Sequence, residues 1–599
     1  MSKLPALPPL HASGATIVDD QGQPVVLRGC NLGNWLLNEM WMMDMAHPGE
    51  PGDQWQMEEV LQQRFGASEK DRLMEVFREN WIKPRDFEIL KTWNFNVVRL
   101  PFNYGLLQDD AAPDQLRTNA FQWLDRAIDM ATRAGIYVIL DMHGAPGRQS
   151  VDQPTGRSGQ NQLWLPENRK RAAFLWRKIA ERYRDSQTVA AYDLMNEPYG
   201  NFGSEPSDST LVATMDQLYR AVREVDQKHL ILFAGSLRGL MMYGSPASRD
   251  WKNVGYTEHF YPGLFGGSPT LETHARFLSR DLRAKADLFK QWQVPFLVGE
   301  FNVVFERAGG AAMMRRYYDT YATNGWAATM WSHKIVKRDG GCHPDNWYLV
   351  TNRDPLTVPS LRTATKDEIE GFFKQMGTME YAQDDELRMA LTSREPPGLV
   401  LHEYPVIPRP APQDALPDGW ESHDVGSPFL EGGQRVTATN SFVIFGGGRD
   451  VFEGNDECRF VYRKAKTHFE LSASLTPPFD THTHAKSGLM YRASLDSDAP
   501  LVMVTLFPDG TCTFAYRRQA AERITEVRLP HPEKAGALRL LRNGAHFEVT
   551  ALDTDGNVFC AKSVDLPELA TTNGAAGFFV LSHEALQMTK AAFSNIRFE

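Results

Sequence analysis

The sequence has few cysteines and no long apolar run. Its 599 residues include five cysteines, none in a C-x-x-C pair, which argues against a zinc or redox signature and against a disulfide framework. An odd number leaves at least one thiol free within a monomer and favours a reducing compartment. No apolar run reaches membrane-spanning length, and Met1–Pro5 lacks the apolar core of a secretory signal. We therefore expect a cytoplasmic protein as the chain stands, or a secreted one if a signal has been removed.

Positive charge is also in deficit. Lys and Arg number 64 against 75 Asp and Glu, so the formal net charge is −11. This balance argues against a nucleic-acid or anionic-membrane partner and fits a neutral ligand such as a sugar. A hydrophobic content of 42% and a charged content of 23% are typical of a globular protein, and the length predicts two or three domains. We expect a monomer without cofactor or metal.

Short apolar stretches alternate with helical patterns in the first part of the chain. The helical segments 119–134, 167–183 and 210–225 carry apolar residues at helical spacing. Eight such strands with helical crossovers predict a (β/α)8 TIM barrel. A doubly wound open sheet is the alternative, but no Gly-rich phosphate loop follows the first strand. The candidate strands are Leu27–Leu32, Asn96–Phe102, Tyr137–Met142, Val189–Asn196, Leu230–Ala234, Val254–Phe260, Phe296–Phe301 and Ala327–Ser332.

Turn residues and prolines set the expected domain boundaries. Residues 1–13 are Pro-rich and predict an arm. The segments Ala15–Val18 and Pro24–Leu27 flank a polar turn and predict a β-hairpin that closes the bottom of the barrel. The barrel is then expected over residues 14–352, and a connector over residues 353–415. That connector contains two helical segments, Lys366–Met376 and Asp384–Leu391, and the stiff proline-rich segment Pro405–Pro412.

Residues 416–599 have a different pattern. Alternating apolar and polar residues are separated by turns such as Asn543-Gly544 and Asp555-Gly556, and no helical run interrupts them. This pattern predicts an all-β, jelly-roll-like sandwich. The candidate strands are 468–475, 488–493, 501–507, 511–517, 537–541, 547–552, 576–581 and 591–598.

Two of the barrel strands deliver a glutamate at their carboxyl end. The apolar run that begins at Ala191 ends in Asn196-Glu197-Pro198, and the run that begins at Val294 ends in Glu300. Barrel enzymes place their chemistry at the carboxyl ends of the strands. Two carboxylates presented there suit cleavage of a glycosidic bond, which needs a proton donor and a nucleophile or base. The alternative to a catalytic pair, for any two glutamates at strand ends, is that both are solvated and have no catalytic role.

Further polar and aromatic residues occupy the other strand ends in order. They are Arg99, His143, Asn196, His259, Tyr261 and Trp331. Together with Glu197 and Glu300 they resemble the pattern of glycoside hydrolase family 5, a clan-A family of retaining barrel enzymes, over roughly residues 14–350. The resemblance implies that Glu197 is the acid/base and Glu300 the nucleophile. It also implies that the other six residues surround the substrate.

Two stretches are similar to the exo-β-1,3-glucanases of that family. One runs from Leu27 to Glu39, and its glutamate is implied to hold the non-reducing-end sugar; the other is Asp141–Gln149. The sequence departs from that pattern at His333, where those enzymes have tryptophan, and at Asn34, where they have glycine. Trp41 and Trp347 are candidates for sugar stacking or for packing.

The resemblance implies hydrolysis of β-glucans or β-glucosides by two displacements with retained configuration. We expect like-charge repulsion from Glu300 to raise the pKa of Glu197. An exo-acting β-glucosidase or exo-β-1,3-glucanase is the main hypothesis. The alternatives are an endo-β-glucanase, a hydrolase of glucosides with an apolar aglycone, and a non-catalytic sugar-binding protein.

The last 180 or so residues resemble a concanavalin-like module of the kind found beside carbohydrate enzymes. The stretches Phe469–Leu475 and Lys486–Arg492 carry that resemblance. A carbohydrate-binding module and a stabilising domain without ligand are both compatible with it.

Overall fold

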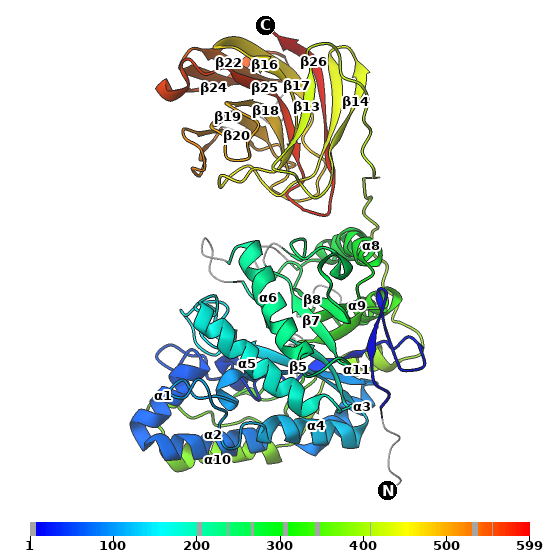
Figure 1. The fold of residues 1–599 in the computed structure, drawn as a ribbon, viewed down its shortest axis with the longest axis vertical. Coiled ribbons are helices and arrows are strands. Elements are labelled where there is room, and N and C mark those ends of the chain that lie inside the picture. The colour runs from blue at the N-terminus through cyan, green and yellow to red at the C-terminus, as the bar shows by residue number, and fades with distance from the viewer. Residues whose placement is uncertain are drawn as a thin grey trace. The chain divides into compact units, whose positions relative to one another are not determined.

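The computed structural model describes residues 7–199, 206–236, 239–264, 269–303, 310–341, 348–407, 409–529, 537–553 and 555–599. The chain divides into two compact units (Figure 1). The first comprises Met1–Leu278 and Ala286–Glu403, and the second comprises Ser279–Lys285 and Tyr404–Glu599. Trp347 lies outside the described residues.

The first unit contains a closed barrel of eight parallel strands, as the sequence predicts. The ring closes because β10 pairs in parallel with β9 on one side and with β3 on the other. Most of these strands are buried along their whole length, which explains why they read as continuous apolar runs. In ring order they are β3 (Arg28–Asn31), β4 (Val97–Asn103), β5 (Tyr137–Gly144), β6 (Val189–Asp193), β7 (Leu230–Ala234), β8 (Val254–Phe260), β9 (Phe296–Phe301) and β10 (Ala327–Met330).

Amphipathic helices connect the strands. In α4 (Gln122–Ala134), the side chains of Trp123, Leu124, Ala127 and Ile128 are buried. Gly135 ends this helix with a φ of 70°, in the left-handed region. The connecting helices are α1 (Gln54–Phe65), α2 (Ala67–Trp81), α3 (Pro84–Thr92), α4 (Gln122–Ala134), α5 (Pro166–Tyr183), α6 (Asp208–Arg223), α7 (Leu271–Arg276), α8 (Leu282–Trp292) and α9 (Gly310–Thr323).

The N-terminal hairpin differs from the predicted one. Strand β1 (His11–Ser13), which lies within the expected arm, pairs with β2 (Thr16–Val18). The predicted partner segment contributes only an isolated bridge between Val18 and Pro24, because proline has no N–H with which to extend a ladder. The side chain of Ile17 nevertheless packs among residues at the starts of the barrel strands, so the hairpin covers the bottom of the barrel as expected.

The connector contains the helices α10 (Lys366–Thr378) and α11 (Asp385–Thr392) and a short sheet of β11 (Val350–Asn352) with β12 (Tyr381–Gln383). Its proline-rich end packs on the sandwich. Ile407 and Ala411 are buried in a cluster with Leu430, Phe445 and Met588. In the described part of this segment the chain is therefore attached to the second unit rather than free in solvent.

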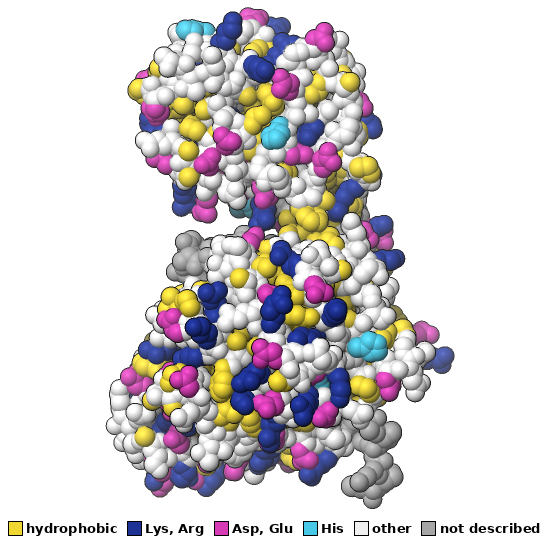
Figure 2. Space-filling model, viewed as in Figure 1, with side chains coloured by type: hydrophobic (Ala, Val, Ile, Leu, Met, Phe, Trp, Pro, Cys, Tyr) yellow, Lys and Arg dark blue, Asp and Glu magenta, His cyan; other side chains and the backbone are white. Residues whose placement is uncertain are grey.

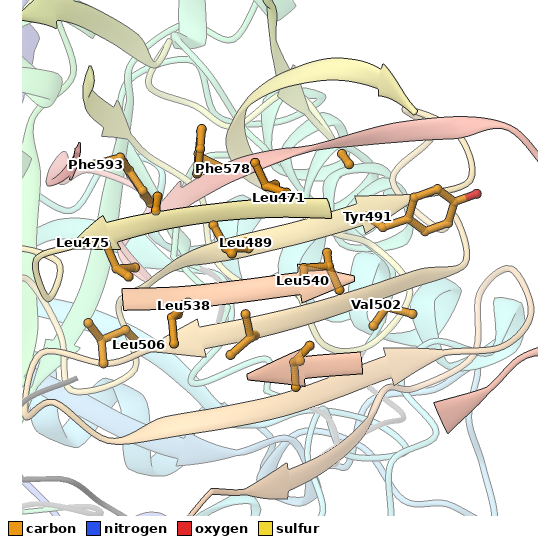
Figure 3. Packing of buried hydrophobic residues seen from close by; sticks show 14 of the residues in the cluster. Leu471, Leu475, Leu489, Tyr491, Val502, Leu506, Leu538, Leu540, Phe578 and Phe593 are labelled. Atoms are coloured by element: carbon orange, nitrogen blue, oxygen red, sulfur yellow. The ribbon is translucent and has the colours of Figure 1, made fainter. Parts of the chain in front are cut away.

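The second unit is a sandwich of two seven-stranded antiparallel sheets. Leu471, Leu489, Val502, Leu538 and Phe578 are among the apolar side chains buried between the sheets (Figure 3). One sheet has the order β13-β16-β25-β18-β19-β20-β21 and the other β14-β15-β26-β17-β22-β23-β24. Their bounds are β13 (Glu421–Val425), β14 (Gly433–Ala438), β15 (Ser441–Gly446), β16 (Cys458–Ala465), β17 (His468–Leu475), β18 (Lys486–Arg492), β19 (Leu501–Leu506), β20 (Cys512–Arg517), β21 (Thr525–Arg528), β22 (Ala537–Asn543), β23 (His546–Leu552), β24 (Val558–Asp565), β25 (Gly574–Leu581) and β26 (Thr589–Phe598).

The surface of each unit mixes charges of both signs. Figure 2 shows basic and acidic side chains interspersed on the visible face of each unit. Within the described ranges, none of the helices has the length and apolar character needed to cross a membrane.

Candidate active site

The predicted site residues gather at the carboxyl ends of the barrel strands. Arg99 lies in β4, His143 in β5, His259 in β8 and Glu300 in β9. The others lie just past a strand: Asn196 and Glu197 after β6, Tyr261 after β8, Trp331 after β10, and Glu39 in the segment that follows β3.

The two glutamates face each other around one imidazole. Nδ1 of His259 lies 2.7 Å from Oε1 of Glu197 and 3.6 Å from Oε2 of Glu300. One carboxylate oxygen of Glu197 and one of Glu300 are within 4.8 Å of each other. Burial lowers the pKa of His259 to about 3, so the ring between the carboxylates is neutral at neutral pH. Two acidic groups 103 positions apart in the sequence thus share one small volume.

Arg99 holds one of these carboxylates and the residues behind it. Its fully buried guanidinium donates to Oε1 of Glu300 at 2.9 Å and to Oδ1 of Asn196 at 2.9 Å. The same group donates to Oδ2 of Asp193 at 2.8 Å and lies 3.1 Å from Oδ2 of Asp141. A buried cation with several carboxylate partners fixes their positions through charge-assisted hydrogen bonds.

Glu300 has a hydrogen-bond donor on each oxygen. Arg99 occupies Oε1, and the hydroxyl of Tyr261 donates to Oε2 at 3.0 Å. Donors on both oxygens hold the carboxylate in one orientation. The arrangement fits a nucleophile, which must keep a fixed position relative to the anomeric carbon.

Glu197 occupies an unusual backbone position at the mouth. Its φ is 36°, a region that residues other than glycine rarely adopt, and such residues concentrate at functional sites. Its side chain keeps 23% of its surface exposed, against 8% for Glu300. The pKa of Glu197 is raised, as expected, but the main cause is burial rather than repulsion by Glu300. Loss of water around the carboxyl penalises its charged form, and this effect outweighs the opposite effects of His143 and Arg99, which lower the pKa.

His143 and Asn196 form a hydrogen-bonded pair. Burial lowers the pKa of His143 to about 4, so the ring is neutral. Its Nδ1 lies 2.6 Å from Oδ2 of Asp141, and its Nε2 lies 3.2 Å from Nδ2 of Asn196. Because Oδ1 of Asn196 accepts from Arg99, the amide turns Nδ2 toward the ring, and Nδ1 of His143 carries the proton. Both ring nitrogens of His143 therefore have protein partners, and one N–H of Asn196 remains for a substrate hydroxyl.

Glu39 and Trp331 line the same mouth. Burial raises the pKa of Glu39 to about 8, with the charges of Glu300 and Glu197 adding to the effect. Nε1 of Trp41 donates to Oε2 of Glu39 at 2.8 Å. The Trp331 ring stacks on His143 with centroids 5.6 Å apart and is only 4% exposed.

Comparison with known proteins identifies the family. The model of "Cellulase (glycosyl hydrolase family 5)" matches residues 65–335. A "Probable glucan 1,3-beta-glucosidase A" of Aspergillus fumigatus Af293 is 30% identical over 315 residues, which cover 50% of this chain and 71% of that protein. The chain belongs to glycosyl hydrolase family 5. A "Beta-xylosidase" of Phanerodontia chrysosporium is 31% identical over 307 residues, and this family 5 chain spans 62% of its length.

The structure adds three residues that the sequence analysis did not assign. Asp141, Asp193 and Asn31 all contact Arg99 of this family 5 chain. Burial raises the pKa of both Asp141 and Asp193 to about 7. The sequence does contain a signal for Asp141 and Asp193, because each of them follows an apolar run. In the structure the two are paired with each other in neighbouring strands. The inward direction of their side chains depends on strand register, which only the closed barrel supplies.

The departure at His333 lies outside the mouth. Nε2 of His333 contacts Oδ1 of the buried Asp86 in α3 at 2.8 Å. Lys334 is buried in the same place, and its ammonium donates to the carbonyl of Trp81 and to the hydroxyl of Tyr381. This family 5 chain therefore uses the residues after Trp331 to join the barrel to its helical layer. Asn34, the other departure, adopts a φ of 63° and accepts a hydrogen bond from the backbone of Glu39.

Proposed function

We propose that this chain is a retaining β-glycoside hydrolase that removes sugar units from the non-reducing end of β-glucans or β-glucosides. The separation of the two carboxylates carries the retaining part of the proposal. Retaining enzymes hold their carboxyl groups roughly 5–5.5 Å apart, whereas inverting enzymes need roughly 6.5–9.5 Å to admit a water. An oxygen of Glu197 within 4.8 Å of one of Glu300 supports the first class.

The roles follow from the surroundings of each carboxylate. Glu300, held by Arg99 and Tyr261, attacks the anomeric carbon as an anion. Glu197, whose pKa burial raises, gives its proton to the leaving oxygen and then activates the water that releases the glycosyl enzyme. The free N–H of Asn196 is placed to bond the 2-hydroxyl of the sugar, a contact that strengthens in the transition state.

The exo mode rests on Glu39 and Trp331. The Glu39 carboxyl with its Trp41 partner supplies polar groups for sugar hydroxyls, and Trp331 supplies a flat apolar wall. The relatives support an exo mode by their names alone, since one is named a β-glucosidase and the other a β-xylosidase.

Release of only monosaccharide from laminarin would support the proposal, and a ladder of oligosaccharides would favour the endo alternative.

The two carboxylate roles are separable by experiment. We expect Glu300→Gln and Glu197→Gln each to lose about 3 kcal/mol or more of transition-state stabilisation, roughly a hundredfold in kcat/KM. With a dinitrophenyl glycoside, whose leaving group needs no proton, Glu197→Gln should still form the glycosyl enzyme and accumulate it. Added azide should then restore turnover and give the β-glycosyl azide.

A matched control is Glu272→Gln, an exposed glutamate in α7 of the same barrel. This variant should keep full activity. Full activity in Glu300→Gln, or initial release of the α-anomer seen by proton NMR, would overturn the proposal.

A further inference from the structure

Three histidines converge in the second unit, away from the proposed catalytic residues. His482 and His484 lie in the segment between β17 and β18, and His583 lies about a hundred residues later, just after β25. One ring nitrogen from each lies within 4.8 Å of the others. The ring centroids of His482 and His583 are 4.4 Å apart, and those of His484 and His583 are 5.3 Å apart.

Ordinary packing does not account for this cluster. The two segments that meet here are far apart in the sequence. His583 also has a φ of 60°, a region that residues other than glycine rarely adopt. Among the described residues, the His482 ring accepts one exposed hydrogen bond, from the backbone N–H of His484 to Nδ1 at 3.1 Å. Nδ1 of His583 is buried without a hydrogen-bond partner among the described residues. Buried polar atoms normally have one, so this nitrogen calls for a ligand.

A carboxylate lies beside the three rings. Oδ2 of Asp450 lies 3.6 Å from Nδ1 of His583, and the same carboxylate also pairs with Lys486.

We propose that His482, His484 and His583 bind one late first-row divalent metal ion, zinc by preference, between two segments of the sandwich. Three imidazoles with a fourth position open to water or to Asp450 match the tetrahedral coordination that zinc adopts. Imidazole nitrogen also suits copper and nickel, whereas magnesium and calcium prefer oxygen ligands. The ion would fasten the two segments to each other.

This inference is independent of the proposed hydrolase function. The test uses the full chain after treatment with EDTA, titrated with zinc chloride in a calorimeter. We expect about one ion per chain and a higher melting temperature in the presence of zinc. Replacing an exposed ligand by His484→Gln should weaken binding by about tenfold or more without unfolding the protein. His482→Gln should do the same.

Two controls locate the ion. His546→Gln changes a half-buried histidine of the same sandwich and should leave zinc binding unchanged. Its Nδ1 lies 2.8 Å from Oδ1 of Asp565. Glu300→Gln should also leave it unchanged, which separates the cluster from the Glu197–His259–Glu300 group. Unchanged affinity in both His484→Gln and His482→Gln, or no binding by the parent chain, would overturn the proposal. Binding lost in Glu300→Gln alone would place the ion in the barrel and overturn it too.

Discussion

At the scale of single residues, the Arg99 guanidinium organises the mouth of the barrel. It is fully buried and contacts Glu300, Asp193, Asn196 and Asp141. A buried charge is tolerated only where partners surround it, and removing one partner leaves the rest uncompensated. The orientation of the proposed nucleophile therefore depends in part on Asp141 and Asp193, which contact Arg99 rather than Glu300.

The carboxyl of Glu39 should make the barrel less stable as the pH rises. Its pKa is about 8 in the folded chain, against 4.5 for an ordinary glutamate, because the side chain is buried. Between these two values the folded state binds the proton and the unfolded state does not, so the free energy of unfolding falls with increasing pH. The loss is complete only above the folded pKa.

Glu39→Gln should remove that loss. We expect the difference in unfolding free energy between about pH 5 and about pH 8 to shrink by roughly 2–4 kcal/mol. Urea titrations followed by tryptophan fluorescence would measure it, because 13 of the 14 tryptophans precede residue 404. Glu59→Gln, at an exposed glutamate of α1, is the matched control and should keep the parental pH dependence. A parental dependence in Glu39→Gln as well would contradict the expectation.

At the scale of elements, the barrel closes through a close approach of β3 and β4. A Cβ added at Gly29 would lie 1.7 Å from the carbonyl oxygen of Val97. That atom belongs to the ladder between the two strands, where Gly29 is paired with Val97. A rigid backbone oxygen cannot move aside as a flexible side chain does, so only glycine fits here.

Gly29→Ala should therefore destabilise the barrel by roughly 3 kcal/mol or more, measured by urea denaturation. The matched change Gly371→Ala lies in α10, where an added Cβ meets no atom within 4 Å. We expect it to stabilise the protein by about 0.5–1 kcal/mol, because alanine is the better helix former. Equal effects of the two substitutions would show that the strand contact is not the cause.

Burial explains which elements the sequence predicted. The barrel strands are covered on both faces and therefore appear as apolar runs, and all eight were predicted within a few residues. In the sandwich the strands at the sheet edges, β13, β14, β21 and β24, were missed, as were β15 and β16. Thr525–Arg528 is exposed throughout, and an edge strand that faces water lacks the apolar alternation by which strands are predicted.

At the scale of the whole molecule, all the predicted catalytic and sugar-binding residues lie in the first unit. The proposed chemistry therefore uses no group from the sandwich. We expect a chain that ends at Glu403 to hydrolyse a small aryl β-glycoside with a kcat within an order of magnitude of the full chain. A folded truncated chain, checked by circular dichroism, that has lost turnover would contradict this expectation.

The truncated chain could instead lose activity on polymeric glucan while it keeps activity on the small glycoside. That result would favour a sugar-binding role for the sandwich over a purely stabilising one. The same truncated chain lacks His482, His484 and His583. It should therefore bind no zinc if Glu300 and His259 hold none, so this measurement also tests the proposed zinc site.

The sequence by itself determined the barrel strands and the polar residues at their carboxyl ends, because both follow from local patterns of burial and from parallel strand order. Only the tertiary structure decided how those residues pair. The contacts of Arg99 with Asp141 and Asp193, the short distance between Glu197 and Glu300, and the meeting of His583 with His482 all join positions far apart in the chain. Such pairings depend on strand register and on the paths of loops, which packing against the rest of the fold sets and no local pattern records.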